Sequence, residues 1–173
     1  MMNNIHPSAI VENCVRLGSR INIGPHTVIG YSGFEYRRVL GNRIHVPPMG
    51  EVIINDGVDI RANVCIDRAT YPFWTTEIGA NTKIDSNVYI AHDVKIGEDC
   101  MVIGCAMIAG RVEIGNRVYI GPGAVISDGI RIGDDAYITI GSVVTRDVKP
   151  GEKVTGNFAV DHHRFIEHLK GMR

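Results

Sequence analysis

A strict six-residue periodicity dominates this 173-residue chain. From Ile54 onward the repeat keeps its phase for 17 units, and thirteen of these units begin with Ile. Periodicity of this kind is the signature of a repeat architecture. The units begin at Ile54, Ile60, Ile66, Pro72, Ile78, Ile84, Ile90, Ile96, Val102, Ile108, Ile114, Ile120, Ile126, Ile132, Ile138, Val144 and Pro150.

The period of six restricts the choice of secondary structure. An α-helix buries a residue about every 3.6 positions and a half-buried strand every second one, so neither fits alone. Short strands separated by a turn every six residues do fit, with Gly, Asn or Asp in the turns. The first and fifth positions of each unit are then expected to point inward. The fifth positions are small or β-branched, as in Val58, Val64, Thr82, Val88, Val94, Ala106, Val112, Val118 and Ala124.

A second block near the N-terminus keeps the same period, but its phase differs by one residue from that of the main block. The stretch between the blocks must therefore hold an insertion, which we place at about residues 31–51. Pro47-Pro48 and several glycines predict that the insertion is a loop. The N-terminal block consists of Ile5, Val11, Leu17, Ile23 and Ile29.

Composition excludes several classes of protein. Lys plus Arg total 18 against 19 for Asp plus Glu, which argues against a nucleic-acid binder held by bulk positive charge. No apolar run approaches the roughly 20 residues of a membrane span, and the first ten residues lack the pattern of a signal peptide. The cysteines form no CxxC pair, so we expect them to be reduced and the protein to be cytoplasmic. They are Cys14, Cys65, Cys100 and Cys105.

Two segments carry a more specific signal. One joins "GFEY" (33–36) to "IHVPPMGEVIINDGVDIRANVCIDRA" (44–69), and the other is "KIDSNVYIAHDVKIGEDCMVIGCAMIAG" (83–110). Together they resemble the UDP-3-O-acylglucosamine N-acyltransferase family of lipid A biosynthesis. The stretch "IAHDV" (90–94) is also similar to the sister UDP-N-acetylglucosamine O-acyltransferases. Both are hexapeptide-repeat proteins, and the resemblance implies an all-β fold, a left-handed parallel β-helix.

In that fold three repeats form one triangular coil of about 18 residues. The main block then makes between five and six coils, and the N-terminal block makes more than one. Neighbouring coils are separated by the strand spacing of a sheet, about 4.8 Å. Residues 18 positions apart are therefore expected to stack on one another.

The repeat ends before the C-terminus. We expect a β-helix domain at 1–156, with its loop insertion at about 31–51, and a C-terminal helical tail at 157–173. Such a helix would cap the open end of the coils or pack on a neighbour, because solenoids need capping. Gly171 is its expected stop, and the helical spacing rests on His162, Phe165, Ile166 and Leu169.

The resemblance assigns catalytic roles to four residues. It implies that His92 is the general base and that Asp85 supports the site, as in the N-acyltransferase pattern. It also implies that Asp93 orients the histidine, as in the O-acyltransferases. Gly110 would supply a backbone N–H to the oxyanion of the tetrahedral intermediate.

The chemistry of acyl transfer agrees with these residue types. Removing a proton from an attacking amine suits a histidine near neutral pH, and the oxyanion needs an N–H donor. Gly110 lies 18 residues after His92, so we expect the two to stack. A structural alternative exists for each: a surface histidine bonded to Asp93, a turn glycine, and an Asp85 that bonds a backbone N–H at a corner.

Two departures from these relatives bear on the substrate. Arg111 stands where both families have histidine, and it follows Asp93 by 18 residues. It would form a surface ion pair with Asp93, or place a positive charge beside a phosphate or an acyl carrier. The coils begin at Ile5, which leaves no room for the N-terminal domain that helps hold uridine in the N-acyltransferases. The expected acceptor is a nucleotide-linked amino sugar or a lipid A-type precursor.

Aromatic residues are candidates for substrate binding alongside Arg111. Phe34 and Tyr36 lie in the insertion, where they would stack on a base or pack between subunits. Trp74 lies 18 residues before His92 and would form a pocket wall or shield a subunit contact.

The expected co-substrate is an acyl thioester, either acyl-CoA or an acyl carrier protein, with no bound cofactor and no metal. The "GNF" of residues 156–158 stands where many relatives that use coenzyme A have Gly-Asn-Pro-Ala and then a basic residue. Phe158 and Val160 replace the proline and the basic residue, which weakens the case for coenzyme A without excluding it.

Other functions remain as alternatives. The nearest is O-acylation of a sugar nucleotide. A hydratase of the gamma carbonic anhydrase kind needs three histidines around a metal, but only His92 lies in the main coils, while His26 and His45 lie elsewhere. A third is a non-catalytic scaffold. The resemblance also implies a homotrimer with active sites between subunits. Outward apolar residues favour burial of a face: Tyr89, Met101, Met107, Tyr119 and Val125.

Overall fold

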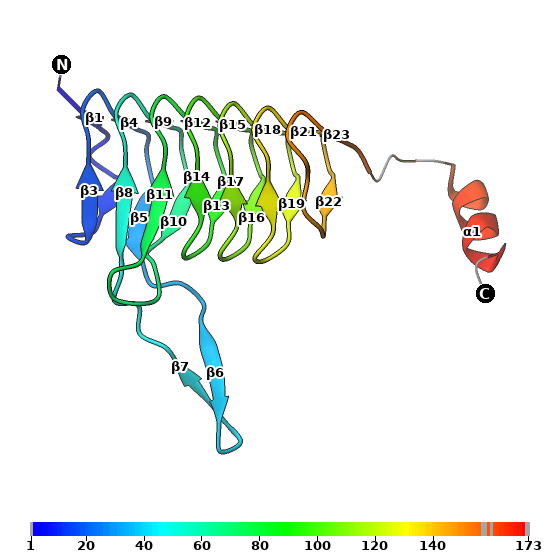
Figure 1. Ribbon diagram of the computed structural model, residues 1–173, viewed down its shortest axis with the longest axis horizontal. Helices are drawn as coiled ribbons and strands as arrows, with labels where there is room; N and C mark the ends of the chain where they lie inside the picture. The colour runs from blue at the N-terminus through cyan, green and yellow to red at the C-terminus, as the bar shows by residue number, and fades with distance from the viewer. Residues whose placement is uncertain (1, 157–158, 160, 172–173) are drawn as a thin grey trace.

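The computed structural model describes residues 2–156, 159 and 161–171. The chain winds into a left-handed parallel β-helix, and one short helix follows it (Figure 1). The predicted fold class is therefore confirmed. The first sheet contains β1 (Asn4–Ile5), β4 (Asn22–Ile23), β9 (Asp59–Ile60), β12 (Lys83–Ile84), β15 (Met101–Val102), β18 (Tyr119–Ile120), β21 (Tyr137–Ile138) and β23 (Lys153–Val154).

The other two sheets form the remaining sides of the triangular prism. The second contains β2 (Ile10–Val11), β5 (Val28–Tyr31), β10 (Cys65–Asp67), β13 (Tyr89–Ile90), β16 (Met107–Ile108), β19 (Val125–Ile126) and β22 (Val143–Val144). The third contains β3 (Val15–Leu17), β8 (Glu51–Ile54), β11 (Thr75–Ile78), β14 (Lys95–Ile96), β17 (Glu113–Ile114) and β20 (Arg131–Ile132).

The core is a column of aliphatic side chains inside the prism. The first and fifth positions of the repeat are buried along the main block, as at Ile90 and Val94. Burying one such side chain contributes about 1.5–3 kcal/mol relative to leaving it in water. Ile5, at the open N-terminal end, remains 40% exposed. Pro72 and Pro150 keep the count of six but lie outside the core.

The spacing between stacked residues changes along the prism. Ile23 pairs with Ile60, 37 residues later, Ile60 with Ile84, 24 later, and Ile84 with Val102, 18 later. The 18-residue coil thus holds from β12 onward, as predicted. In the coil below, one extra hexapeptide leaves the wall as a loop at residues 68–74, which we call the corner loop.

The predicted loop insertion contains a β-hairpin. β6 (Tyr36–Val39) pairs with β7 (Asn42–His45) in antiparallel fashion, and we call residues 32–49 the arm (Figure 1). Its turn residues Leu40 and Gly41 have φ values of 48° and 84°, which matches a two-residue turn of type I′. Leucine is unusual there, which explains why the sequence did not reveal the hairpin.

The turns of the main block repeat one conformation every six residues. Asn87, Asp93 and Asp99 have φ values of 61°, 63° and 54°, in the left-handed region that Asn and Asp tolerate. Arg111 adopts it as well, with a φ of 60°. These turns set the direction in which the corner side chains leave the prism.

The helix α1 (His162–Gly171) begins where Asp161 accepts hydrogen bonds from the N–H groups of His163 and Arg164. It buries none of its described residues and lies away from the coils (Figure 1). The expectation that it caps the coil stack is therefore wrong for a single chain, and packing on a neighbour stays a prediction. No helix among the described residues has the length and apolar character needed to cross a membrane.

Candidate active site

One corner of the prism collects most of the chemically interesting residues. It lies where the chain passes from the second sheet to the third. The arm leaves this corner between β5 and β8, and the corner loop leaves it one coil later, between β10 and β11. The next coils place His92, Gly110 and Asp128 there in succession.

His92 lies at this corner between β13 and β14, and only 8% of its surface is exposed. Its Nδ1 lies 2.7 Å from Oδ2 of Asp93. An ionised carboxylate only accepts hydrogen bonds, so Nδ1 carries the proton and donates it. The neutral ring then has a free lone pair on Nε2, the atom that a general base uses.

Asp93 is itself held in place by the coil below. Its Oδ1 accepts the backbone N–H of Thr70 at 2.9 Å, and its own N–H donates to Oγ1 of Thr76, also at 2.9 Å. All three residues are buried. The corner loop thus fixes Asp93, and Asp93 fixes the orientation of the imidazole.

Gly110 lies beside the imidazole, one coil above His92. The register Ile90 to Ile108 places the two residues in one stack. A Cβ atom on Gly110 would lie 2.8 Å from Cε1 and 3.0 Å from Nε2 of His92. Gly110 is buried, and its N–H donates to no acceptor within the described parts of the chain. A buried N–H without a partner is costly unless a ligand accepts it.

The charges around His92 favour its protonated form. Its pKa is raised from the usual 6.5, first because of the hydrogen bond to Asp93, although burial acts in the opposite direction. The charge of Glu35 adds to the increase and that of Arg111 opposes it. The pKa of Asp93 is lowered: burial alone would raise it, but the hydrogen bonds from His92 and Thr70 outweigh burial.

Replacing Asp93 with asparagine is expected to lower the pKa of His92, because the main cause of its increase is removed. Nitrogen NMR of the imidazole between about pH 5 and 9 measures this directly. The charges that remain near the ring are Glu35, Asp67 and Arg111. Because the folded-state pKa is raised, the ionised His92 stabilises the fold below about pH 6.5, and this is lost as pH rises through the folded-state value.

Asp99→Asn is the matched control for this titration. Asp99 occupies the same turn position six residues later, with a similar φ, and it is exposed. An unchanged pKa of His92 in Asp93→Asn would contradict the hydrogen bond seen here.

Sequence reasoning missed two carboxylates near His92. Oε2 of Glu35, in the arm, lies 3.7 Å from Nε2 of His92. Asp67 is buried, accepts the hydroxyl of Tyr89 at 2.6 Å, and has a raised pKa because of its burial. Both belong to segments quoted for the family resemblance, "GFEY" and "CIDRA", but the repeat gives no register across the arm that would have paired them with His92.

Asp85 does not join this site within one chain. It lies at the corner between β12 and β13, where its carboxylate accepts the N–H groups of Ser86 (2.7 Å) and Gly104 (3.2 Å). This is the structural alternative considered above. A role in the site would require a neighbouring subunit.

Arg111 pairs with Asp128, not with Asp93 as expected. Its guanidinium makes two hydrogen bonds of 2.8 and 2.7 Å to that carboxylate. Asp128 is closer to its reach because it belongs to the next coil of the same corner. The predicted ion pair between Arg111 and Asp93 is therefore wrong.

Trp74 reaches the site by a different route from the one expected. The coil below His92 has 24 residues, so Trp74 belongs to the corner loop and does not stack under His92. It nevertheless lines a groove of about 410 Å³ beside the site. The groove is lined by Phe73, Trp74, Thr75, Asp93, Lys95, Arg111 and Glu113.

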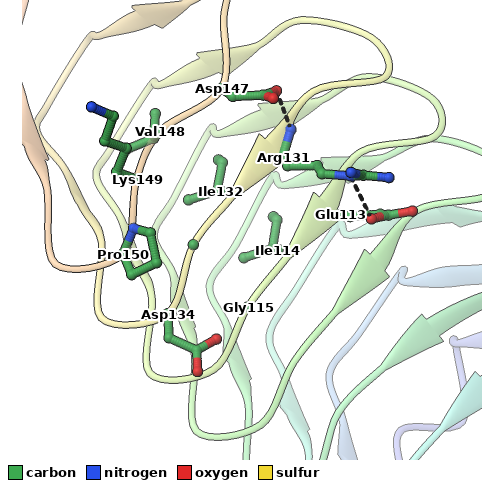
Figure 2. Close-up of a pocket in the computed structure, with 11 residues that line it drawn as sticks. Glu113, Ile114, Gly115, Arg131, Ile132, Asp134, Asp147, Val148, Lys149 and Pro150 are labelled. Atoms are coloured by element: carbon green, nitrogen blue, oxygen red, sulfur yellow. Dashed lines mark hydrogen bonds and ion pairs between the residues drawn. The ribbon is translucent and has the colours of Figure 1, made fainter.

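A second groove, of about 490 Å³, adjoins the first at Glu113 and continues along the third sheet (Figure 2). Figure 2 shows the guanidinium of Arg131 on Glu113 and its backbone N–H on Asp147, at 3.0 and 2.8 Å. Lys149 and Pro150 close its far side. The two grooves form an elongated surface that starts at Trp74.

The remaining candidates are distributed more widely. Phe34 and Tyr36 lie at the foot of the arm with ring centroids 4.9 Å apart, and both are exposed. Asn157, Phe158 and Val160 lie outside the described residues. The outward apolar residues belong to two faces, not one: Met101 and Tyr119 lie on the first sheet, and Tyr89, Met107 and Val125 on the second.

Comparison with known proteins agrees with this architecture. UDP-3-O-acylglucosamine N-acyltransferase of Xanthomonas oryzae pv. oryzae is 50% identical over 54 residues, which are 31% of this chain and 16% of that protein. The match therefore spans about a sixth of the curated relative's length. UDP-N-acetylglucosamine O-acyltransferase of Moraxella catarrhalis superposes with a TM-score of 0.68 at 23% identity, over 95% of this chain and 77% of that one.

A third similar structure contains ligands. It is a histidine-to-asparagine mutant of perosamine N-acetyltransferase from Caulobacter crescentus, in complex with CoA and GDP-perosamine. It is 25% identical, with a TM-score of 0.54, over 90% of this chain and 54% of that one. The family profile described as "GMPPB C-terminal domain" matches residues 74–167, more than half of the chain. The chain, with its His92 corner inside the matched stretch, therefore belongs to this family.

Proposed function

We propose that the protein is an N-acyltransferase. It moves an acyl group from a thioester to the amino group of a nucleotide-linked amino sugar or a lipid A-type precursor. The observation that carries the proposal is the corner itself: a buried histidine with a free Nε2 lies against a buried N–H that has no acceptor. Acyl transfer needs these two groups side by side.

Each group has one role in the reaction. The nitrogen lone pair of the acceptor attacks the thioester carbonyl carbon and forms the C–N bond, while Nε2 of His92 takes the amine proton. The N–H of Gly110 donates to the oxyanion. When the C–S bond breaks, the thiolate leaves and His92 returns the proton to it. Asp93 keeps the ring in the required tautomer, and Asp85 would support the site from a neighbouring subunit.

The grooves along the third sheet suit an elongated thioester donor. Arg111, Lys95 and Arg131 provide positive charge for phosphates, and Trp74 provides an apolar wall. We favour acyl-CoA, since the perosamine N-acetyltransferase was solved with CoA, and keep acyl carrier protein as the alternative donor. Phe34 and Tyr36 would stack on the base of the acceptor.

The relatives also support proposals about context. We propose a homotrimer with the site closed by a neighbouring subunit, a cytoplasmic location, and a place in the biosynthesis of lipopolysaccharide or a related surface glycan.

A donor and acceptor screen tests the function. Acetyl-CoA, a long-chain acyl-CoA and an acylated carrier protein are each combined with GDP-perosamine, UDP-N-acetylglucosamine and the 3-amino analogue of the latter. Free thiol and product mass are measured, with His92→Ala as the blank for spontaneous hydrolysis. Thiol release that depends on an amino acceptor supports the proposal. Release with UDP-N-acetylglucosamine alone indicates O-acylation, and no acceptor-dependent release overturns both.

A further inference from the structure

Glu35 occupies an unusual place at the foot of the arm. It comes from a segment outside the six-residue repeat, yet only 19% of its side chain is exposed. The chain reaches this place by passing directly over His92 at Gly33, where a Cβ would lie 3.3 Å from the imidazole and 3.2 Å from Oδ2 of Asp67. A glycine at that point lets the arm approach the ring.

The two oxygens of Glu35 have different surroundings. Oε1 pairs with Nε of Arg37 at 3.3 Å, and Arg37 also donates to the hydroxyl of Tyr71 in the corner loop. Oε2 faces Nε2 of His92 at 3.7 Å and accepts no hydrogen bond from the described residues. The carboxylate is therefore anchored on one side and open on the side of the base.

The gap between the two acceptors is the size of one donor atom. A separation of 3.7 Å is too long for a direct hydrogen bond. A nitrogen about 2.9 Å from each of the two atoms fits between them. Such a nitrogen must donate twice, once to Nε2 of His92 and once to Glu35. An amino group has two or three donors, whereas a hydroxyl has only one.

We propose that Glu35 binds the amino group of the acceptor and makes the site select an amine over a hydroxyl. This inference rests on the proposed function and names the group that decides between N- and O-acylation. The acceptor nitrogen lies between Nε2 of His92 and Oε2 of Glu35. The arm thus supplies half of the binding site for the nucleophile, and the coil supplies the other half.

The chemistry gives Glu35 a reason to be charged. As the amine forms its bond to the carbonyl carbon, the nitrogen acquires positive charge. Nε2 of His92 removes one proton, and the carboxylate stabilises the other N–H through a charge-assisted hydrogen bond, about twice as strong as a neutral one. Glu35 neither gains nor loses a proton in the cycle.

The test compares Glu35→Gln with wild type on acceptors that differ only in amine and hydroxyl. The pairs are GDP-perosamine with GDP-rhamnose, and the 3-amino analogue of UDP-N-acetylglucosamine with UDP-N-acetylglucosamine itself, all with acetyl-CoA. We expect kcat/KM in the variant to fall about tenfold more for the amine than for its hydroxyl partner. Glu167→Gln, on the exposed face of α1, is the control and should keep the wild-type preference.

A second readout does not depend on turnover. The pKa of His92, measured by nitrogen NMR, should fall in Glu35→Gln, because the charge facing Nε2 is lost. Unchanged selectivity in an active Glu35→Gln enzyme overturns the inference alone, and so does an unchanged pKa. A wild-type protein that releases no thiol with any of these acceptors overturns the proposed function and the inference with it.

Discussion

Replacing His92 with alanine is expected to lower the turnover number for acyl transfer by about 10²–10⁴-fold. The reason is that no other described side chain at the corner combines a free basic nitrogen with contact to Gly110. Glu35 and Asp67 lie nearby, but carboxylates are weak bases near pH 7. The measurement is thiol release with the best donor and acceptor pair, at saturating concentrations of both.

A second substitution separates loss of chemistry from loss of structure. In His92→Ala, the carboxylate of Asp93 stays buried and loses its partner, which destabilises the site. In His92→Asn the side-chain amide keeps a donor for Asp93 but has no basic nitrogen, so the fold should be retained and the activity lost. His26→Asn, at a different corner of the prism, is the control. Turnover within a few fold of wild type in His92→Asn, with an unchanged melting temperature, would show that His92 is not the base.

The stack of His92 and Gly110 followed from the sequence, because an uninterrupted repeat carries its own register. Tyr89 pairs with Met107, so residues 18 apart do lie one above the other in this part of the prism. The same reasoning failed one coil earlier for Trp74. The corner loop adds one whole hexapeptide, and an insertion of one period leaves the phase unchanged. Only the exposed Pro72 at a core position marked it in the sequence.

The arm illustrates the opposite case. Its length is not a multiple of six, so it shifted the phase by one residue and was detectable. Its internal structure and its position were not, because residues outside the repeat have no register. Glu35 and its contact with His92 therefore required the three-dimensional structure. The pairing of Arg111 with Asp128, not with Asp93, was missed for a related reason: stacking predicts neighbours but not which neighbour a long side chain chooses.

Replacing Gly110 with alanine is expected to lower the turnover number by about 10²–10³-fold, the cost of losing one oxyanion donor. The new methyl group would lie 2.8 Å from Cε1 of His92, closer than carbon atoms normally approach. The ring cannot simply turn away, because Nδ1 is bound to a buried Asp93. The methyl group would also stand where the thioester has to approach the N–H.

These two effects can be separated by repeating the substitution in the His92→Ala protein. There the ring is absent, so the methyl group has room and only the approach to the N–H is affected. If Gly110 serves the oxyanion, Gly110→Ala still lowers the residual acceptor-dependent thiol release of His92→Ala by about tenfold or more. If it acts only by displacing the histidine, the second substitution has no effect in that background, and the oxyanion role of Gly110 is wrong. Melting temperatures of the single and double variants establish that the comparison is made between folded proteins.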